Sequence, residues 1–271
     1  MTTKERPERE QILLIDDEAI MRDVLGTLLR KEGYHLLAER LDAFAFASEP
    51  DAARVTAWTR IAAPGSAKGF SASYDYAISC WGDVTLEVEL TPVGGLDVPL
   101  PKVGLELLLP QSLDRVAWYG RGPGESYVDS REAGRFGVWE TDVDGLATPY
   151  VHPQENGNRT DVRWVRLADA GGTGLFARGY PTLDFSAHRW SRENLERAAH
   201  PTDLVPAPAL TLNLDHRHHG LGSATCGPGP WEQYVLKPEP MRFRLRLAGF
   251  CREAASPWML YRREPAELTP G

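Results

Sequence analysis

The stretch Phe70–Leu90, FSASYDYAISCWGDVTLEVEL, decides the fold because its side chains change character at every second position. Apolar and aromatic residues occupy positions 70, 72, 74, 76 and 78, and smaller or polar residues lie between most of them. After Trp81-Gly82-Asp83, apolar residues at 84, 86, 88 and 90 alternate with Thr85, Glu87 and Glu89. A period of two is typical of a strand with one buried face, so the two runs and their glycine turn predict a β-hairpin.

The same period returns outside this hairpin. In Met241–Leu247, apolar residues alternate with Arg242, Arg244 and Arg246, which predicts a half-buried strand whose arginines lie on a solvated outer face. One short helix is expected within Arg192–Ala199. Further short strands, separated by Gly, Pro and Asn turns, are expected at Val103–Leu109, Val116–Tyr119, Val162–Leu167 and Leu210–Leu214. Many strands and few helices predict a mainly β protein built as an antiparallel sandwich or barrel.

Composition and charge exclude several ligands and locations. The 271 residues include 38 acidic and 30 basic side chains, and no basic stripe is present, so nucleic acid is not an expected partner. No apolar run approaches the roughly 20 residues that cross a bilayer, so we expect no membrane partner. The charged start MTTKERPEREQ has no signal-peptide core behind it, which favours a cytoplasmic location. Cys80, Cys226 and Cys251 lack CxxC spacing, which indicates reduced thiols rather than disulfides or a zinc site.

Four motifs carry a resemblance to a known family. They are LPKVGLELLLP (Leu100–Pro110), WYGRGPGESYVDSREAG (Trp118–Gly134), TPYVHPQENGNRTDVRW (Thr148–Trp164) and GLGSATCGPGP (Gly220–Pro230). In these motifs and their order, the chain resembles the C-terminal domain, or small chain, of β-galactosidases of glycoside hydrolase family 2. The resemblance implies a large antiparallel β-sandwich of the galactose mutarotase type, a supersandwich. We expect this domain at residues 41–252, a frayed tail at 253–271, and a short βα fragment at 1–40.

The resemblance also implies which parts of the enzyme are elsewhere. A retaining β-galactosidase uses two carboxyl groups about 5 Å apart, and the family presents them from a TIM barrel of about 250 residues. This chain cannot contain a barrel beside its β domain. We therefore expect no catalytic residue, cofactor or metal site in it, with Mg²⁺ and Na⁺ bound only by the absent catalytic domain. The implied partners are a catalytic large chain or upstream domains, and a galactoside substrate.

The candidate substrate-binding residues are Cys226, Glu155, Asn156, Arg159 and Arg163. The resemblance implies that one side chain of this domain lines the sugar pocket. In some relatives this side chain is a tryptophan, and in the GxGSxxCGP variant of the motif, which this chain has, the matching residue is Cys226. The alternative is a buried cysteine without substrate contact. The other four residues form the densest polar group of the sequence. They could hydrogen-bond sugar hydroxyls, or they could form a salt-bridged network that fixes the packing of the domain.

The histidines suggest two further interpretations. Within Asp215–His219, strand alternation would place His216 and His218 on one face, which is feasible for a metal, but no third ligand is defined and we assign none. Exposed turn histidines are the expected alternative. A mutarotase-like protein that binds or epimerises an aldose, with an acid/base pair such as His200 and Glu155, is a second hypothesis for the function.

The N-terminus has a different character. ILLIDDEAIMRDVLGTLLRKEGY (Ile12–Tyr34) has the pattern of a strand followed by a helix, and it resembles the start of a response-regulator receiver domain. Asp16 and Asp17 match the acidic residues that help such domains bind Mg²⁺. Where the phosphoacceptor aspartate is expected, the chain reads VTAWTRIAAPG (Val55–Gly65), without any aspartate. A two-component response regulator is therefore the least favoured function, and we expect the junction near Leu36–Asp42.

Overall fold

The predicted hairpin is present in the computed structural model, which describes residues 11–14, 35–48, 52–223, 227–251 and 256–263. Strands β4 (Gly69–Ser79) and β5 (Val84–Val93) pair antiparallel along their whole length. At the turn, Gly82 has a φ of +80°, in the left-handed region that favours glycine. The residues with period two thus form the hairpin that their pattern predicts.

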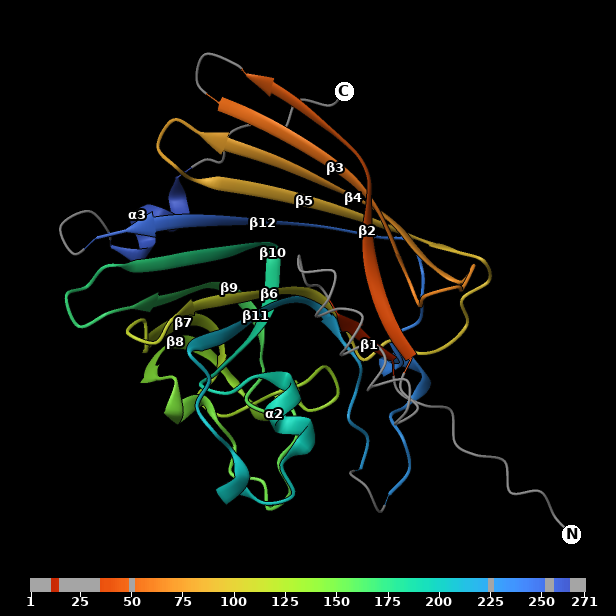
Figure 1. Ribbon diagram of the computed structural model, residues 1–271. Coiled ribbons are helices and arrows are strands. Elements are labelled where there is room, and N and C mark those ends of the chain that lie inside the picture. Colours follow the sequence, from red (N-terminus) through yellow and green to blue (C-terminus); the bar gives the residue numbers. More distant parts are fainter. Residues whose placement is uncertain (1–10, 15–34, 49–51, 224–226, 252–255, 264–271) are drawn as a thin grey trace, which may run out of the picture.

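Most strands belong to one long, curved sheet (Figure 1). In spatial order it contains β1 (Gln11–Leu14), β2 (His35–Ser48), β3 (Ala52–Ala62), β4, β5, β12 (Met241–Phe250), β10 (Gly174–His188), β9 (Arg159–Ala168), β7 (Arg115–Gly122) and β8 (Arg135–Asp142). Two further strands lie off this path: β11 (Ala209–His218) pairs with β10, and β6 (Lys102–Pro110) pairs with β11. Among the described pairings, all are antiparallel except that of β1 with β2.

Strand β10 joins the two layers of the sandwich. Its first half, Gly174–Tyr180, pairs with β12, and its last residues, Asp184–His188, pair with β11. The pairing of β10 with β9 shifts in register between these halves. Because β10 changes neighbours along its length, β11 and β6 form a second, smaller layer that packs against the long sheet.

Two apolar clusters hold the layers together. The larger lies around Trp118, Phe185 and Leu212, and the apolar residues of β6 pack against it. A second contains Val88 and Phe243 from β5 and β12. The prediction of an antiparallel β-sandwich is confirmed by this topology and by its two-layered core.

The expected short elements are also found. The four further strand predictions fall within β6, β7, β9 and β11, and the predicted helix is α2 (Arg192–Arg197), whose N-terminus is capped by the Ser191 side chain. Short 3-10 helices occur at η1 (Arg131–Ala133), η2 (Asp144–Leu146), η3 (Pro201–Asp203) and η4 (Glu232–Tyr234). Within the described ranges, none of the helices has the length and apolar character needed to cross a lipid bilayer.

The arginine row of β12 differs from its expected solvated surface. Arg242 is exposed, but Arg246 is 0% exposed. Helix α3 (Pro257–Arg262) covers it, and the Arg246 guanidinium donates hydrogen bonds to the carbonyls of Leu260 and Arg263 at the end of that helix. The prediction was wrong at Arg246 because α3, within the expected frayed tail, packs Leu260 against the outer face of the sheet.

The N-terminal region is described only in part. Strand β1 lies where the first strand was expected, and it pairs in parallel with the start of β2. The expected helix and the acidic residues Asp16 and Asp17 lie outside the described residues. Strand β2 continues across residue 40, and most of the Val55–Gly65 stretch belongs to β3 in the sandwich sheet.

Candidate functional site

Four charged side chains from three segments form one array at the edge of the smaller layer. Lys102, at the start of β6, donates to Glu155 Oε1 at 2.6 Å, and its Nζ lies 3.7 Å from Asp215 Oδ2 of β11. The same Asp215 oxygen accepts a hydrogen bond from His218 Nε2 at 2.8 Å. The order Glu155, Lys102, Asp215, His218 alternates in sign, so each charge has an opposite neighbour. We call these four residues the charged array.

Burial and charge act in opposite directions on the pKa values of the array. Burial alone would raise the pKa of Asp215, but Lys102 and His218 together lower it. Burial alone would lower the pKa of His218, but the hydrogen bond and negative charge of Asp215 raise it. The pair is therefore favoured as carboxylate and imidazolium.

Asp184 is the titratable neighbour of this array. It lies on β10 directly opposite Asp215, and its Oδ1 accepts a hydrogen bond from the backbone N–H of Asp161 at 3.3 Å. Loss of hydration raises its pKa to about 7; the positive His218 opposes this rise and the negative Asp215 adds to it. Asp184 thus holds a proton at a pH where an ordinary aspartate does not.

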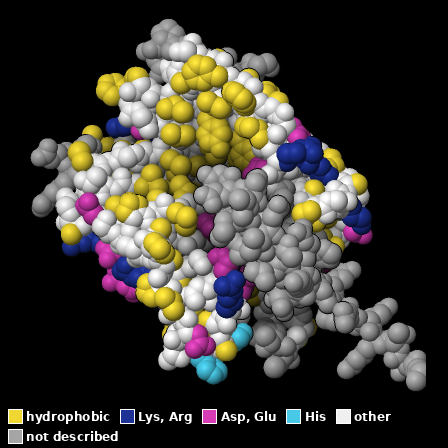
Figure 2. Space-filling model, in the orientation of Figure 1, with side chains coloured by type: hydrophobic (Ala, Val, Ile, Leu, Met, Phe, Trp, Pro, Cys, Tyr) yellow, Lys and Arg dark blue, Asp and Glu magenta, His cyan; other side chains and the backbone are white. Residues whose placement is uncertain are grey.

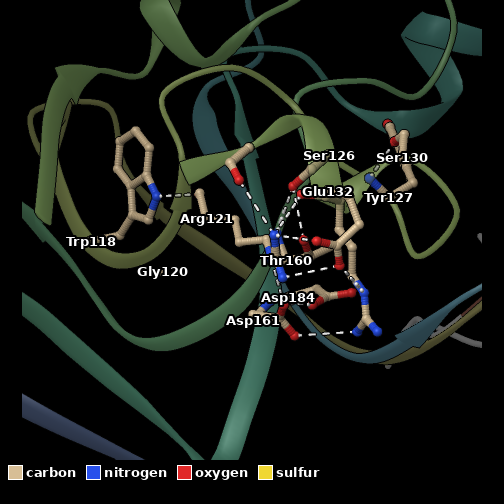
Figure 3. Close-up of polar contacts among 12 residues, drawn as sticks. Trp118, Gly120, Arg121, Ser126, Tyr127, Ser130, Glu132, Thr160, Asp161 and Asp184 are labelled. Carbon is tan, nitrogen blue, oxygen red and sulfur yellow. Dashed lines mark hydrogen bonds and ion pairs between the residues drawn. The ribbon is translucent and has the colours of Figure 1, made fainter. Parts of the chain in front are cut away.

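A second polar network joins the glycine-rich GRGPGESYVD segment to β9 (Figure 3). Arg121 Nε donates to Asp161 Oδ2 at 2.7 Å, and Arg121 Nη2 lies 3.2 Å from Glu132 Oε1. The Ser126 and Thr160 hydroxyls are 2.9 Å apart. Hydrogen bonds and ion pairs within the chain thus hold this segment against β9.

Asn156 and Arg159 are buried and bonded to backbone groups. Asn156 Oδ1 accepts from Thr148 N at 2.9 Å. Arg159, 2% exposed, donates to the carbonyls of Pro123 at 2.9 Å and Gly157 at 2.7 Å, and its guanidinium carbon lies 5.4 Å from the Trp118 ring centroid. Burial lowers the pKa of Arg159 to about 10. These contacts fix the loop that carries Glu155.

The remaining predicted site residues are placed differently. Arg163 is exposed on β9, and its guanidinium carbon lies 5.6 Å from the Phe136 ring centroid. It is not part of the charged array. Cys226 lies outside the described residues. Its loop has defined ends, because Ser223 N donates to Pro228 O at 3.0 Å and Gly222 N donates to Asp129 Oδ2 at 2.8 Å.

The histidine predictions need correction in part. His218 is buried in the charged array and is not an exposed turn residue. His216 instead stacks on Phe243 at 4.9 Å, so the two do not form a common site. His200 is exposed, with Nδ1 2.7 Å from Ala199 O, whereas Glu155 binds Lys102. Among the described residues, no group of three or more His, Cys, Asp or Glu side chains could hold a metal ion.

Sequence reasoning missed several residues that organise this region. They are Lys102, Asp184, Asp215 and Glu125, whose carboxylate accepts hydrogen bonds from the Tyr150 hydroxyl and from Gly157 N. Lys102 and Glu125 lie inside two of the quoted motifs, which is the signal that could have found them. An open cavity of about 580 Å³ elsewhere, beside Asp114, Asp142 and Asp169, contains none of the predicted site residues.

Fold and site together define an antiparallel β-sandwich domain, at one edge of which the charges of Glu155, Lys102, Asp215 and His218 neutralise one another. The sequence model of the family described as β-galactosidase small chain matches residues 26–247. The chain belongs to this family.

Individual relatives agree with the assignment. The chain is 33% identical over 195 residues to a β-galactosidase of Arthrobacter sp. (strain B7), covering 70% of this chain and 19% of that protein. It is 35% identical over 184 residues to the β-galactosidase of Kluyveromyces lactis, covering 66% and 17%. The chain thus spans less than one fifth of the length of these relatives. Among solved structures, a GalM/aldose epimerase homologue from C. elegans is similar with a TM-score of 0.40 and 12% identity, over 77% of this chain and 68% of that one.

Proposed function

We propose that this chain is a non-catalytic domain or small subunit of a β-galactosidase, which docks on a catalytic large chain and forms part of the wall of the galactoside pocket. The observation that carries the proposal is the family match over residues 26–247, in relatives of which the chain covers only 19% and 17%. The remainder of such an enzyme would supply the barrel, the catalytic glutamates, and the ligands of Mg²⁺ and Na⁺. We assign neither catalysis nor metal binding to residues of this chain.

The charged array supports a role without catalysis. A retaining glycosidase needs two carboxyl groups about 5 Å apart that face the substrate. Here Glu155 and Asp215 are both neutralised by Lys102, and Asp215 is buried against His218. These carboxylates are therefore engaged in holding the edge of the domain.

Cys226 is the residue that we propose as a direct substrate neighbour. Its loop is anchored at Gly222 and Ser223, a few residues after His218. A thiol at this position leaves more room and gives less stacking than an aromatic ring. In the assembled enzyme, Cys226→Trp should change KM for a galactoside more than kcat, and an unchanged KM would remove Cys226 from the pocket.

A cytoplasmic location is part of the proposal. Cys80 and Cys251 are free and exposed, which suits a reducing compartment.

The experiment uses a chromogenic galactoside and the Arthrobacter enzyme with its matched region deleted, here called the truncated enzyme. We expect neither the purified chain nor the truncated enzyme to hydrolyse the substrate alone, and the mixture to do so. Hydrolysis by the chain alone, or none by the mixture, would contradict the proposal.

An aldose-epimerising protein is the second candidate function. It is favoured by the neighbouring pair Asp184 and His218: Asp184 lies directly opposite Asp215, which accepts the hydrogen bond of His218, and burial raises the pKa of Asp184 to about 7. Such a pair could exchange protons with a sugar hydroxyl. Faster anomer equilibration of galactose by the isolated chain, abolished in Asp184→Asn, would establish this function.

A further inference from the structure

The long sheet has an apolar face that extends beyond the smaller layer. Leu41, Phe44 and Phe46 on β2 are 57%, 69% and 65% exposed, and Ile78 on β4 is 37% exposed. In Figure 2, hydrophobic side chains gather over the region where β2–β5 lie in Figure 1. We call these four residues the β2 patch.

The register shows that the patch continues the buried core. Phe44 lies opposite Ala57, and the same row continues through Tyr74, Val88 and Phe243. Residues directly opposite one another share a face of the sheet. Because Val88 and Phe243 are buried in the second core cluster, Phe44 lies on the face that forms the core farther along the sheet.

A bulge places all three β2 side chains on this face. Leu41 pairs with Thr59 and Ala43 with Trp58, so Asp42 is the extra residue. In a regular strand Leu41 would point away from Phe44 and Phe46; the bulge turns it to the same side. The sequence thus directs three large apolar side chains at an area that the smaller layer does not cover.

The edge of β2 is open as well. Among the described residues, the side of β2 that faces away from β3 is paired only at His35–Ala38, with β1. The segment beyond includes AFAFAS (Ala43–Ser48), which has neither charge nor proline. Natural proteins protect such edges with charges, prolines or a covering element, so this segment is suited to accept another strand.

We propose that the β2 patch and the open edge of β2 are the docking surface for the catalytic part of the β-galactosidase, which adds a strand to β2 and an apolar layer over Leu41, Phe44 and Phe46. The inference rests on the proposed function. In the relatives, more than four fifths of the polypeptide lies outside the matched region and is available to cover this face.

A second copy of the chain fits the surface less well. Antiparallel pairing of two β2 edges about a two-fold axis keeps equivalent faces on the same side. The two Phe44 rows would then form one larger exposed apolar face, and neither would be covered. A partner that supplies both a strand and a covering layer would pair with the open edge of β2 and bury the β2 patch at the same time.

The test compares two variants of the full chain for binding to the truncated enzyme. Phe44→Ser/Phe46→Ser removes the two most exposed rings of the patch, and Leu108→Ser is the matched control, since Leu108 on β6 is also 69% exposed. We expect the double variant to bind at least about tenfold more weakly and the control to stay within about twofold of the wild type. Circular dichroism of each variant establishes that it is folded.

Hydrogen exchange of the wild-type chain gives a readout that does not depend on the variants. Those amides of Glu39–Ser48 that face away from β3 should exchange at least about tenfold more slowly in the complex, because an added strand accepts their hydrogen bonds. Equal binding of wild type and double variant, or unchanged exchange in β2, would overturn the docking surface alone. Failure of the wild type to bind would overturn the proposed function as well. Self-association that already protects β2 without the truncated enzyme would identify a second copy as the occupant and overturn the inference.

Discussion

Asp215 and His218 lie three positions apart in β11, yet their side chains meet at 2.8 Å. In a regular strand, residues three apart point to opposite faces. In the pairing of β11 with β6 the register shifts between Asp215 and Arg217 and leaves out His216, so a bulge turns both side chains to one side. The contact at the centre of the charged array therefore depends on one extra residue.

Removing one charge of this buried pair should be costly. Asp215→Asn leaves His218 and Lys102 without their shared carboxylate, and we expect a loss of about 3 kcal/mol in the free energy of unfolding measured with urea. Glu239→Gln is the control, because Glu239 pairs with Arg217 of the same strand and that pair is half exposed, and it should cost less than about 1 kcal/mol. Equal effects of the two variants would show that the array does not stabilise the domain.

The Asp215–His218 pair should stabilise the domain most within a defined range of pH. The lowered pKa of Asp215 gives stability that is present above its unfolded value of 3.8 and is lost as pH falls through the folded value. The raised pKa of His218 gives stability that is present below 6.5 and is lost as pH rises through the folded value. The difference in unfolding free energy between wild type and Asp215→Asn should therefore be largest between pH 3.8 and 6.5. A difference that is the same at every pH would contradict this.

Asp184 should make the domain less stable as pH rises, whereas an ordinary paired aspartate makes a protein more stable as pH rises. Its folded pKa of about 7 lies above the unfolded value of 3.8, so the folded state holds the proton longer and stability falls as pH rises between these values. Asp184→Asn keeps a neutral side chain at every pH. Its stability relative to wild type should increase with pH across this window, by at most about 1.4 kcal/mol per pH unit, and parallel curves would exclude the raised pKa.

Arg246 should hold helix α3 on the outer face of the sheet. Arg246→Met removes the guanidinium donors to the carbonyls of Leu260 and Arg263, at a cost of about 2–4 kcal/mol, and the amides of α3 should exchange faster. Arg242→Met on the same strand is the control, since the Arg242 side chain is 64% exposed and should contribute less than about 1 kcal/mol. Unchanged exchange in α3 would contradict the assigned role.

The two arginines of the NGNRTDVRW segment, Arg159 and Arg163, should contribute differently to the free energy of unfolding. Arg159→Met leaves the carbonyls of Pro123 and Gly157 without partners in a buried loop, so we expect a loss of about 2–4 kcal/mol. Arg163→Met removes an exposed side chain and should change stability by less than about 1 kcal/mol. If Arg159→Met left stability unchanged and only weakened substrate binding in the assembled enzyme, its role would be recognition and not loop structure.

The sequence predicted those parts of the fold that depend on neighbouring residues. The hairpin of β4 and β5 follows from alternation and from Gly82, and both are readable along the chain. Burial of Arg246 was not predictable in this way, because an alternating arginine looks solvated until a remote helix covers it. Strand period alone does not show what packs on the outer face.

The candidate site was predictable only in part for the same reason. The polar motif around Glu155 and Arg159 was found, but its partner Lys102 comes from a strand more than fifty residues earlier in the chain. The Asp215–His218 contact requires a bulge, and strict alternation predicts that these side chains point apart. Cys226 remains a prediction.

The proposed role of this chain is to complete a β-galactosidase. The most direct measurement is the rate of galactoside hydrolysis by a fixed amount of truncated enzyme, titrated with the wild-type chain. We predict a rate that rises from zero and saturates at one chain per truncated enzyme. A rate that stays at zero across the titration, or one that rises linearly with the chain in the absence of the truncated enzyme, would contradict this role.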